Sequence, residues 1–144
     1  MISNSMKKLL VFGLPGSGKT TLARHLVYKL RDSGKTVTWL NADDIRSHFN
    51  DWDFSTEGRI RQSKRMRELA DASENDYSLC DFVAPLAEMR DNFNADYTIW
   101  VDTIIEGRFA DTNKAFIPPD KYDFRVTEQD AEKWSSLIIP EILR

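Results

Sequence analysis

One eight-residue segment near the N-terminus, G-L-P-G-S-G-K-T at residues 13–20, constrains the fold more than any other part of this 144-residue chain. It matches the pattern G-x-x-x-x-G-K-[ST] at every fixed position. A continuous apolar run, residues 9–12, precedes it, and apolar residues recur at helical spacing from Thr20 to Gly34. The order of buried strand, glycine-rich turn and amphipathic helix is the one that a phosphate-binding loop requires.

Each residue type in this segment has a physical reason. Glycines allow backbone angles and close approaches that a Cβ would block, so successive N–H groups can turn inward toward an anion. We expect Lys19 to act in catalysis by contacting the β- and γ-phosphates, and the Thr20 hydroxyl to bind Mg²⁺. The predicted ATP-binding residues are Gly13, Leu14, Pro15, Gly16, Ser17, Gly18, Lys19, Thr20 and Thr21.

Strands and helices alternate along the rest of the chain. Further strands are expected at residues 36–40, 77–83, 97–101 and 124–126, and helices at 43–49, 55–75, 85–93 and after a capping box of Thr127 and Asp130. This alternation predicts one α/β domain, residues 1–144, in which a mostly parallel five-stranded sheet lies between two helical layers in a P-loop NTPase fold of the nucleoside- and nucleotide-kinase kind. The loops after the first four strands should share one ligand-binding rim.

Composition limits the partners. A net charge of −3 and a pI of about 5.4 argue against long nucleic acid, while a basic pocket for a small anionic substrate remains compatible with them. Cys80 is the only cysteine, so no internal disulfide framework exists. The N-terminal apolar run is too short for a signal peptide or a membrane span, and we therefore expect a cytoplasmic protein that does not enter membranes. A homodimer is left open.

Charged residues follow the second predicted strand. Asp43 is interpreted as catalytic, because a carboxylate beside the loop can orient a magnesium-bound water or accept a proton from an attacking hydroxyl. The alternative is that Asp43 or Asp44 caps the next helix. Arg46 and Arg59 stand near loop-to-helix junctions on the same rim, where arginine can hold a phosphate or sulfate with two hydrogen bonds.

The remaining basic residues of the 55–75 helix, Arg61, Lys64, Arg65 and Arg67, are interpreted as a solvated face paired with Glu68 and Asp71.

With these residues assembled, the chain resembles the adenylylsulfate kinase family, most strongly over residues 13–65. That family transfers the γ-phosphoryl group of ATP to the 3′-hydroxyl of adenylylsulfate. The segment N-A-D-D-I-R at 41–46 is similar to the family's D-G-D-N-[VI]-R, which implies that Asp43 is the catalytic aspartate and Arg46 a substrate-binding arginine. Phe54, Ser55 and Arg59 fit the family's G-F-S-x-x-D-R.

The resemblance assigns further roles in the binding of the acceptor. It implies that Phe54 stacks on the substrate adenine and that Arg59 holds the anionic part. Gln62 stands where the family has a substrate-binding asparagine, and F-V-A-P at 82–85 resembles F-I-S-P, which places Val83 at the substrate. Lys114 and Phe116 match the family's K-x-F, and Phe116 would be the second aromatic of an adenine sandwich.

Four positions depart from the family. Pro15 stands where serine is common in the phosphate loop, Asn41 replaces the first aspartate of D-G-D, Gln62 replaces the asparagine, and Ala84 replaces a serine that is phosphorylated in some members. The segment at about 104–123 is short and divergent. We expect it to form a lid in which Arg108 or Lys114 approaches the transferred phosphoryl group and the Pro118-Pro119 pair stiffens a hinge.

Two other functions remain open. The first is a kinase for a nucleoside, a nucleotide or a polynucleotide 5′-hydroxyl, because the lid segment that determines acceptor specificity is divergent here. The second is a nucleotide-binding module without turnover, although residues 113–116, N-K-A-F, lack the aspartate of the guanine-reading N-K-x-D motif.

Overall fold

The computed structural model describes residues 5–106 and 115–144. Its strands are β1 (Lys7–Phe12), β2 (Val37–Asn41), β3 (Tyr77–Phe82), β4 (Tyr97–Val101) and β5 (Phe124–Val126). Its helices are α1 (Lys19–Asp32), α2 (Ala42–Phe49), α3 (Thr56–Asp71), α4 (Ala87–Phe93) and α6 (Ala131–Ile142). The strands form one sheet in the order β2-β3-β1-β4-β5, and every neighbouring pair is parallel.

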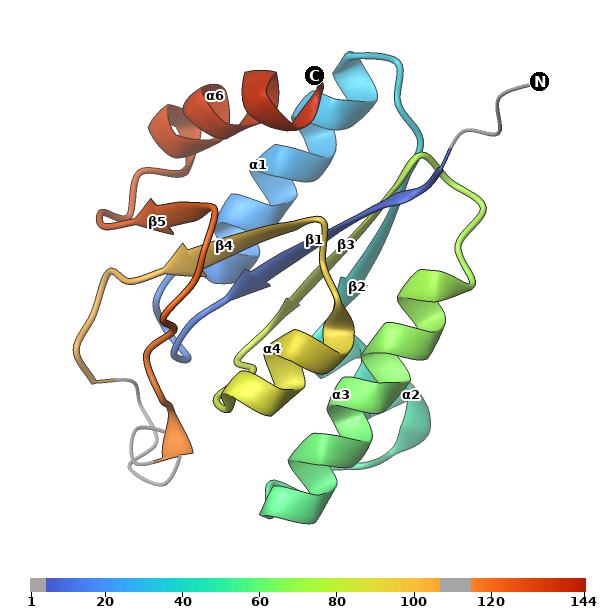
Figure 1. The fold of residues 1–144 in the computed structure, drawn as a ribbon, viewed down its shortest axis with the longest axis vertical. Coiled ribbons are helices and arrows are strands. Elements are labelled where there is room, and N and C mark those ends of the chain that lie inside the picture. The colour runs from blue at the N-terminus through green and yellow to red at the C-terminus, as the bar shows by residue number, and fades with distance from the viewer. Residues whose placement is uncertain (1–4, 107–114) are drawn as a thin grey trace.

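Helices cover both faces of the sheet (Figure 1). Helices α1 and α6 pack on one face, and α3 and α4 pack on the other. Residues 9–12 of the central strand β1 are all apolar because both faces of this strand are buried. Leu9 and Val11 join the core under α1 and α6, whereas Leu10 and Phe12 join the core under α3 and α4. The predicted three-layer α/β architecture is confirmed.

Some predicted boundaries are wrong. Helix α6 begins at Ala131, and its N-cap is Asp130, whose side chain accepts a 3.2 Å hydrogen bond from the Lys133 backbone N–H. Thr127 is therefore not the cap, because the chain leaving β5 first passes the phosphate loop, where the side chain of Gln129 contacts the Gly16 carbonyl.

Two other helices are shorter than predicted. Helix α3 ends at Asp71, since Ser73 and Asn75 direct their side chains to the Thr38 hydroxyl of β2, and α4 begins at Ala87. The Ser55 N-cap of α3 is confirmed by a 3.2 Å hydrogen bond from the Gly58 N–H.

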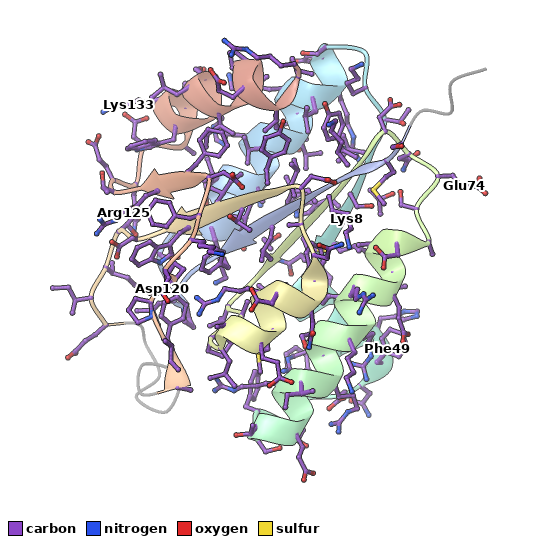
Figure 2. All side chains as sticks on the ribbon, in the orientation of Figure 1. Lys8, Phe49, Glu74, Asp120, Arg125 and Lys133 are labelled. Atoms are coloured by element: carbon purple, nitrogen blue, oxygen red, sulfur yellow. The ribbon has the colours of Figure 1, made fainter. Side chains whose placement is uncertain are left out.

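Lys8 joins the two helices on the α3–α4 face to the sheet (Figure 2). Its ammonium group lies 2.8 Å from the Asp71 carboxylate at the end of α3 and donates to the carbonyl oxygen of Phe93 at the end of α4. Only 7% of Lys8 is exposed. This buried lysine therefore holds the helical layer in place.

Within residues 5–106 and 115–144, no helix combines the length and the apolar character that a membrane crossing needs.

Candidate active site

The phosphate loop is tightly turned between β1 and α1. Gly16 and Gly18 have φ angles of 87° and 95°, which favour glycine strongly over other residues. A Cβ on Gly13 would lie 2.5 Å from the carbonyl oxygen of Val101 in β4, so the close contact between the loop and the sheet also requires a glycine. Helix α1 starts directly at Lys19 and directs its N-terminus at the loop.

Two side chains that the sequence motif did not reveal brace the loop from outside. Thr103 donates a 2.6 Å hydrogen bond from its hydroxyl to the Ser17 carbonyl oxygen. Gln129 donates a 3.1 Å hydrogen bond from its side-chain amide to the Gly16 carbonyl oxygen. The segments after β4 and β5 thus hold the carbonyl groups of the loop in a defined orientation.

A cavity of about 510 Å³ lies at the carboxyl ends of the strands. Many of the predicted site residues line it: Pro15, Gly16, Lys19, Thr20, Asp43, Arg46, Phe54, Arg59, Gln62 and Val83. Residues that follow β1, β2 and β3 thus meet at one rim, as the alternating pattern predicts. The predicted fourth loop, after β4, supplies none of its described residues to the cavity lining, although Thr103 in it contacts the phosphate loop at Ser17. Arg108 and Lys114 lie outside the described residues.

Asp81, at the end of β3, is a cavity residue that sequence reasoning missed. Only 1% of it is exposed, and three neutral groups donate to its carboxylate: the Thr20 hydroxyl at 3.0 Å, the Asn41 amide at 2.8 Å and the Trp39 indole at 2.7 Å. Burial raises the pKa of Asp81, while these hydrogen bonds and the charge of Lys19 oppose the shift. The one available signal is a charged residue inside an otherwise apolar run, because aspartate is rarely buried without partners, but this signal does not reveal what those partners are.

The N-terminus of α2 shows which residue caps this helix and whether Asp43 is that residue. Asn41 is the N-cap, and its side-chain oxygen accepts a 3.1 Å hydrogen bond from the Asp44 N–H. The alternative that Asp43 or Asp44 caps the helix is therefore wrong. Asp43 is exposed and lines the cavity, whereas Asp44 is exposed and is absent from the cavity lining.

Arg46 is placed behind Phe54. Its guanidinium is 4.4 Å from the centre of the Phe54 ring, and its Nη1 donates to the carbonyl oxygens of Asp51 at 2.9 Å and Asp53 at 3.2 Å. Burial lowers the pKa of Arg46, but an arginine remains charged at neutral pH. Arg46 therefore fixes the 51–54 loop and supports Phe54, which itself remains 54% exposed.

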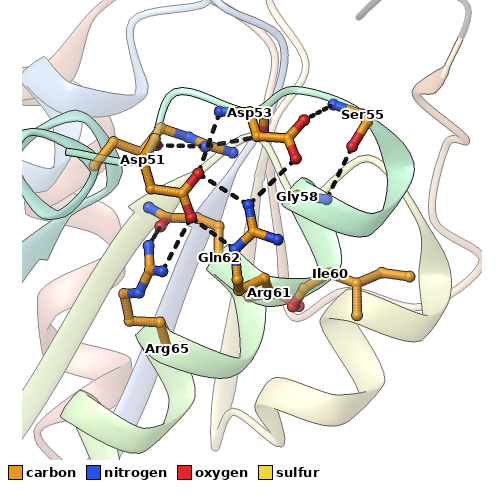
Figure 3. Close-up of polar contacts among 10 residues, drawn as sticks. Asp51, Asp53, Ser55, Gly58, Ile60, Arg61, Gln62 and Arg65 are labelled. Atoms are coloured by element: carbon orange, nitrogen blue, oxygen red, sulfur yellow. Dashed lines mark hydrogen bonds and ion pairs between the residues drawn. The ribbon is translucent and has the colours of Figure 1, made fainter. Parts of the chain in front are cut away.

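A network of ion pairs holds the same loop from the other side (Figure 3). The Asp51 carboxylate accepts hydrogen bonds from Arg61 at 2.7 Å and from Arg65 at 3.0 Å, and these bonds lower the pKa of Asp51 well below its usual range. The predicted pairing of Arg61 and Arg65 with Glu68 and Asp71 is therefore wrong, because both guanidinium groups contact Asp51 instead. Arg67 makes the predicted kind of pair, with Asp71 at 3.5 Å.

Gln62 and Arg59 both contact the surrounding backbone. Gln62 donates to the Ala42 carbonyl oxygen at 3.0 Å and accepts from Arg65 at 2.9 Å, so it connects α2 to α3. Arg59 donates a 2.8 Å hydrogen bond to the Phe54 carbonyl oxygen.

Phe116 packs on the core and does not line the cavity that Phe54 lines. Its ring stacks on Phe12 with centroids 6.5 Å apart, and the Arg90 guanidinium lies 5.6 Å from its centre. The cavity lining does not include Phe116. The structure therefore does not bring together the two aromatic residues of the predicted sandwich.

A glycine-rich loop between β1 and α1, a parallel sheet of this strand order and a cavity at the strand ends that is lined by the loop and by charged side chains define a P-loop protein of the small-molecule-kinase type. The sequence model of the adenylylsulphate kinase family matches residues 6–107. The chain belongs to that family.

Individual relatives agree with this assignment. The adenylyl-sulfate kinase of Halothermothrix orenii is 36% identical over 81 residues, which are 54% of this chain and 44% of that protein. The chain thus spans less than half the length of that relative.

Solved structures share the fold. The APS kinase CysC of Mycobacterium tuberculosis, in complex with AMPPNP and APS, superposes with a TM-score of 0.81 at 20% identity, covering 99% of this chain and 100% of that one. A shikimate kinase from Acinetobacter baumannii, in complex with shikimate, gives a TM-score of 0.65 at 18% identity, covering 97% and 94%.

Proposed function

We propose that this protein transfers the γ-phosphoryl group of ATP to the 3′-hydroxyl of adenylylsulfate. The observation that carries the proposal is the shared cavity, because it holds the phosphate-loop residues Lys19 and Thr20 together with Asp43, Phe54 and Arg59 from two other segments. Phosphoryl transfer depends mainly on positioning and on electrostatic stabilisation, and this set of side chains supplies both.

The phosphate loop supplies the groups that bind the nucleotide phosphates on one side of the cavity. Backbone N–H groups and the α1 N-terminus bind the phosphates, and Lys19 contributes a point charge. Thr20 and, through a water molecule, Asp43 would hold Mg²⁺, since their hard oxygen atoms suit this ion. When bound, Mg²⁺ neutralises charge that develops on the phosphate oxygens.

The acceptor side is formed by α2, α3 and the loop between them. Asp43 orients the attacking hydroxyl and accepts its proton. Phe54 offers an exposed aromatic face for the adenine, and its position is fixed by Arg46 from behind. Arg59 and Arg46 supply positive charge to the phosphosulfate group.

A turnover panel tests the proposal. Purified protein with ATP and Mg²⁺ is offered adenylylsulfate, nucleosides, nucleotides, shikimate and a 5′-hydroxyl oligonucleotide, and the phosphorylated products are separated by chromatography. We expect transfer to adenylylsulfate, and Lys19→Ala should lose both nucleotide binding and transfer. A product from any other acceptor alone would overturn the assignment.

A binding measurement supports the panel. Adenylylsulfate should raise the melting temperature in the presence of ADP and Mg²⁺, because a ligand at about 100 times its Kd stabilises a protein by about 2.7 kcal/mol. A cytoplasmic location is also part of the proposal, and cell fractionation tests it. Light scattering decides whether the protein forms the homodimer that the sequence leaves open.

A further inference from the structure

Asn41 and Asp81 occupy paired positions at the ends of neighbouring strands. They are register partners in the parallel β2–β3 ladder, and the Asn41 side-chain nitrogen lies 2.8 Å from a carboxylate oxygen of Asp81. The same nitrogen lies 3.4 Å from the Thr20 hydroxyl, which donates to Asp81 at 3.0 Å. One amide, one carboxylate and the last residue of the phosphate motif therefore form a single cluster.

The resemblance between residues 41–46 and the family motif D-G-D-N-[VI]-R gives this pair its meaning. Asn41 stands at the position of the first aspartate of that motif, so the end of β2 carries a neutral amide in place of a carboxylate. The carboxylate that remains at the same place in space belongs to the directly paired residue of β3. We propose that Asp81 supplies the metal-side carboxylate of this phosphate site and that the charge has been transposed from β2 to β3, with Asn41 as its positioning partner.

The hydrogen bonds around the cluster support this role. A hydroxyl has one proton and two lone pairs, and the Thr20 proton is directed at Asp81. One lone pair of Thr20 accepts the long hydrogen bond from the Asn41 amide and the other is available to a cation in the cavity, so Asp81 sets the orientation of a metal-binding oxygen. Asn41 cannot rotate freely, because its own oxygen accepts the capping bond from Asp44.

A purely structural role would not require a charge here. Indole, amide and hydroxyl donors can also satisfy an amide oxygen, and removing an ionised carboxylate from water is costly. Asp81 is buried and lines the same cavity as Lys19, where a cation bound to phosphate oxygens would compensate its charge. The inference rests on the proposed function only in assuming that the bound anion is a nucleotide with Mg²⁺.

Charge transposition tests the inference. Three variants are compared with wild type: Asp81→Asn, the double variant Asn41→Asp/Asp81→Asn, and the control Asp44→Asn, which changes an exposed aspartate next to the same N-cap. The readout is the affinity for ADP, measured by calorimetry over a series of Mg²⁺ concentrations. The double variant keeps one amide and one carboxylate, and aspartate is as good an N-cap as asparagine, so it should fold.

The expected results are specific. Asp81→Asn should raise the Mg²⁺ concentration needed for half-maximal enhancement of ADP binding by about 10- to 100-fold, the range seen when groups that orient metal ligands are removed. It should leave ADP affinity without Mg²⁺ nearly unchanged. The double variant should recover most of the Mg²⁺ dependence, and Asp44→Asn should resemble wild type.

Two results would overturn the inference: an unchanged Mg²⁺ dependence in Asp81→Asn, or a double variant as impaired as the single one. Since no acceptor is present, failure of the adenylylsulfate assignment would not affect this outcome.

Discussion

Arg90 donates a 2.7 Å hydrogen bond from Nη2 to the carbonyl oxygen of Ile117, and thereby joins α4 to the chain that follows residues 107–114. The Ile117 N–H in turn donates to the Pro85 carbonyl oxygen at 2.7 Å. The Arg90 guanidinium also lies 5.0 Å from the Phe12 ring centre and 5.6 Å from that of Phe116. This contact anchors the C-terminal end of the predicted lid to the core.

Replacing Arg90 should destabilise the protein. Arg90→Met removes a hydrogen bond from a charged donor at a residue that is only 7% exposed, and should lower the free energy of unfolding by about 1.5–3 kcal/mol. Urea denaturation measures the change. Arg67→Met is the matched control, because Arg67 is exposed and its pairing should contribute at most about 1 kcal/mol. Equal stability of the two variants would contradict the anchoring role.

Neighbouring aspartates allow a sharp test of the proposed general base. Asp43→Ala should leave ATP binding nearly intact and lower kcat by at least about 10², the usual scale for a positioned acid or base. Asp44→Ala, which removes the adjacent first-turn carboxylate outside the cavity lining, should turn over nearly as fast as wild type. Steady-state kinetics with ATP and adenylylsulfate distinguishes the two. Similar rates for Asp43→Ala and wild type would rule out this assignment.

The sequence predicts those parts of the site that depend on local order. The phosphate loop is recognisable because its glycines, Lys19 and Thr20 are contiguous, and Asp43 is placed at the rim because parallel strands end at one edge. The layers of the fold follow from the alternation of strand and helix patterns in the same way.

Contacts between distant segments could not be predicted. The pairing of Asp81 with Asn41 depends on the register between β2 and β3, which the sequence does not specify. Gln129 lies far from Gly16 in the chain, and no spacing rule connects them. Phe116 could stack on a ligand or on the core, and the structure places it on Phe12.

For Gly58 the structure predicts a change in stability opposite in sign to the one that helix propensity predicts. It lies in the first turn of α3, where alanine would ordinarily favour the helix by about 1 kcal/mol. A Cβ at this position, however, would lie 2.2 Å from the Asp53 carbonyl oxygen, and this backbone atom can move only with the loop that carries Phe54. Gly58→Ala should therefore destabilise the protein by about 1–3 kcal/mol and raise the KM for adenylylsulfate.

Urea denaturation and steady-state kinetics check both effects of Gly58→Ala. Glu57→Ala, at an exposed neighbouring position in the same turn, serves as the control and should change neither quantity appreciably. Greater stability of Gly58→Ala than wild type would show that the 51–54 loop can move without cost.

The ion pairs of Asp51 should make the free energy of unfolding depend on pH in the acid range. Hydrogen bonds from Arg61 and Arg65 lower the pKa of Asp51 in the folded protein, whereas an unfolded chain has an ordinary carboxyl near about 4. The folded state thus binds fewer protons, so the contribution of Asp51 is fully present above about pH 4 and is lost as pH falls toward the lowered pKa. Urea midpoints of wild type and Asp51→Asn should therefore differ at pH 7 and converge as pH falls below about 4. A constant difference over this range would mean that the charge of Asp51 does not stabilise the loop that positions Arg46 and Phe54.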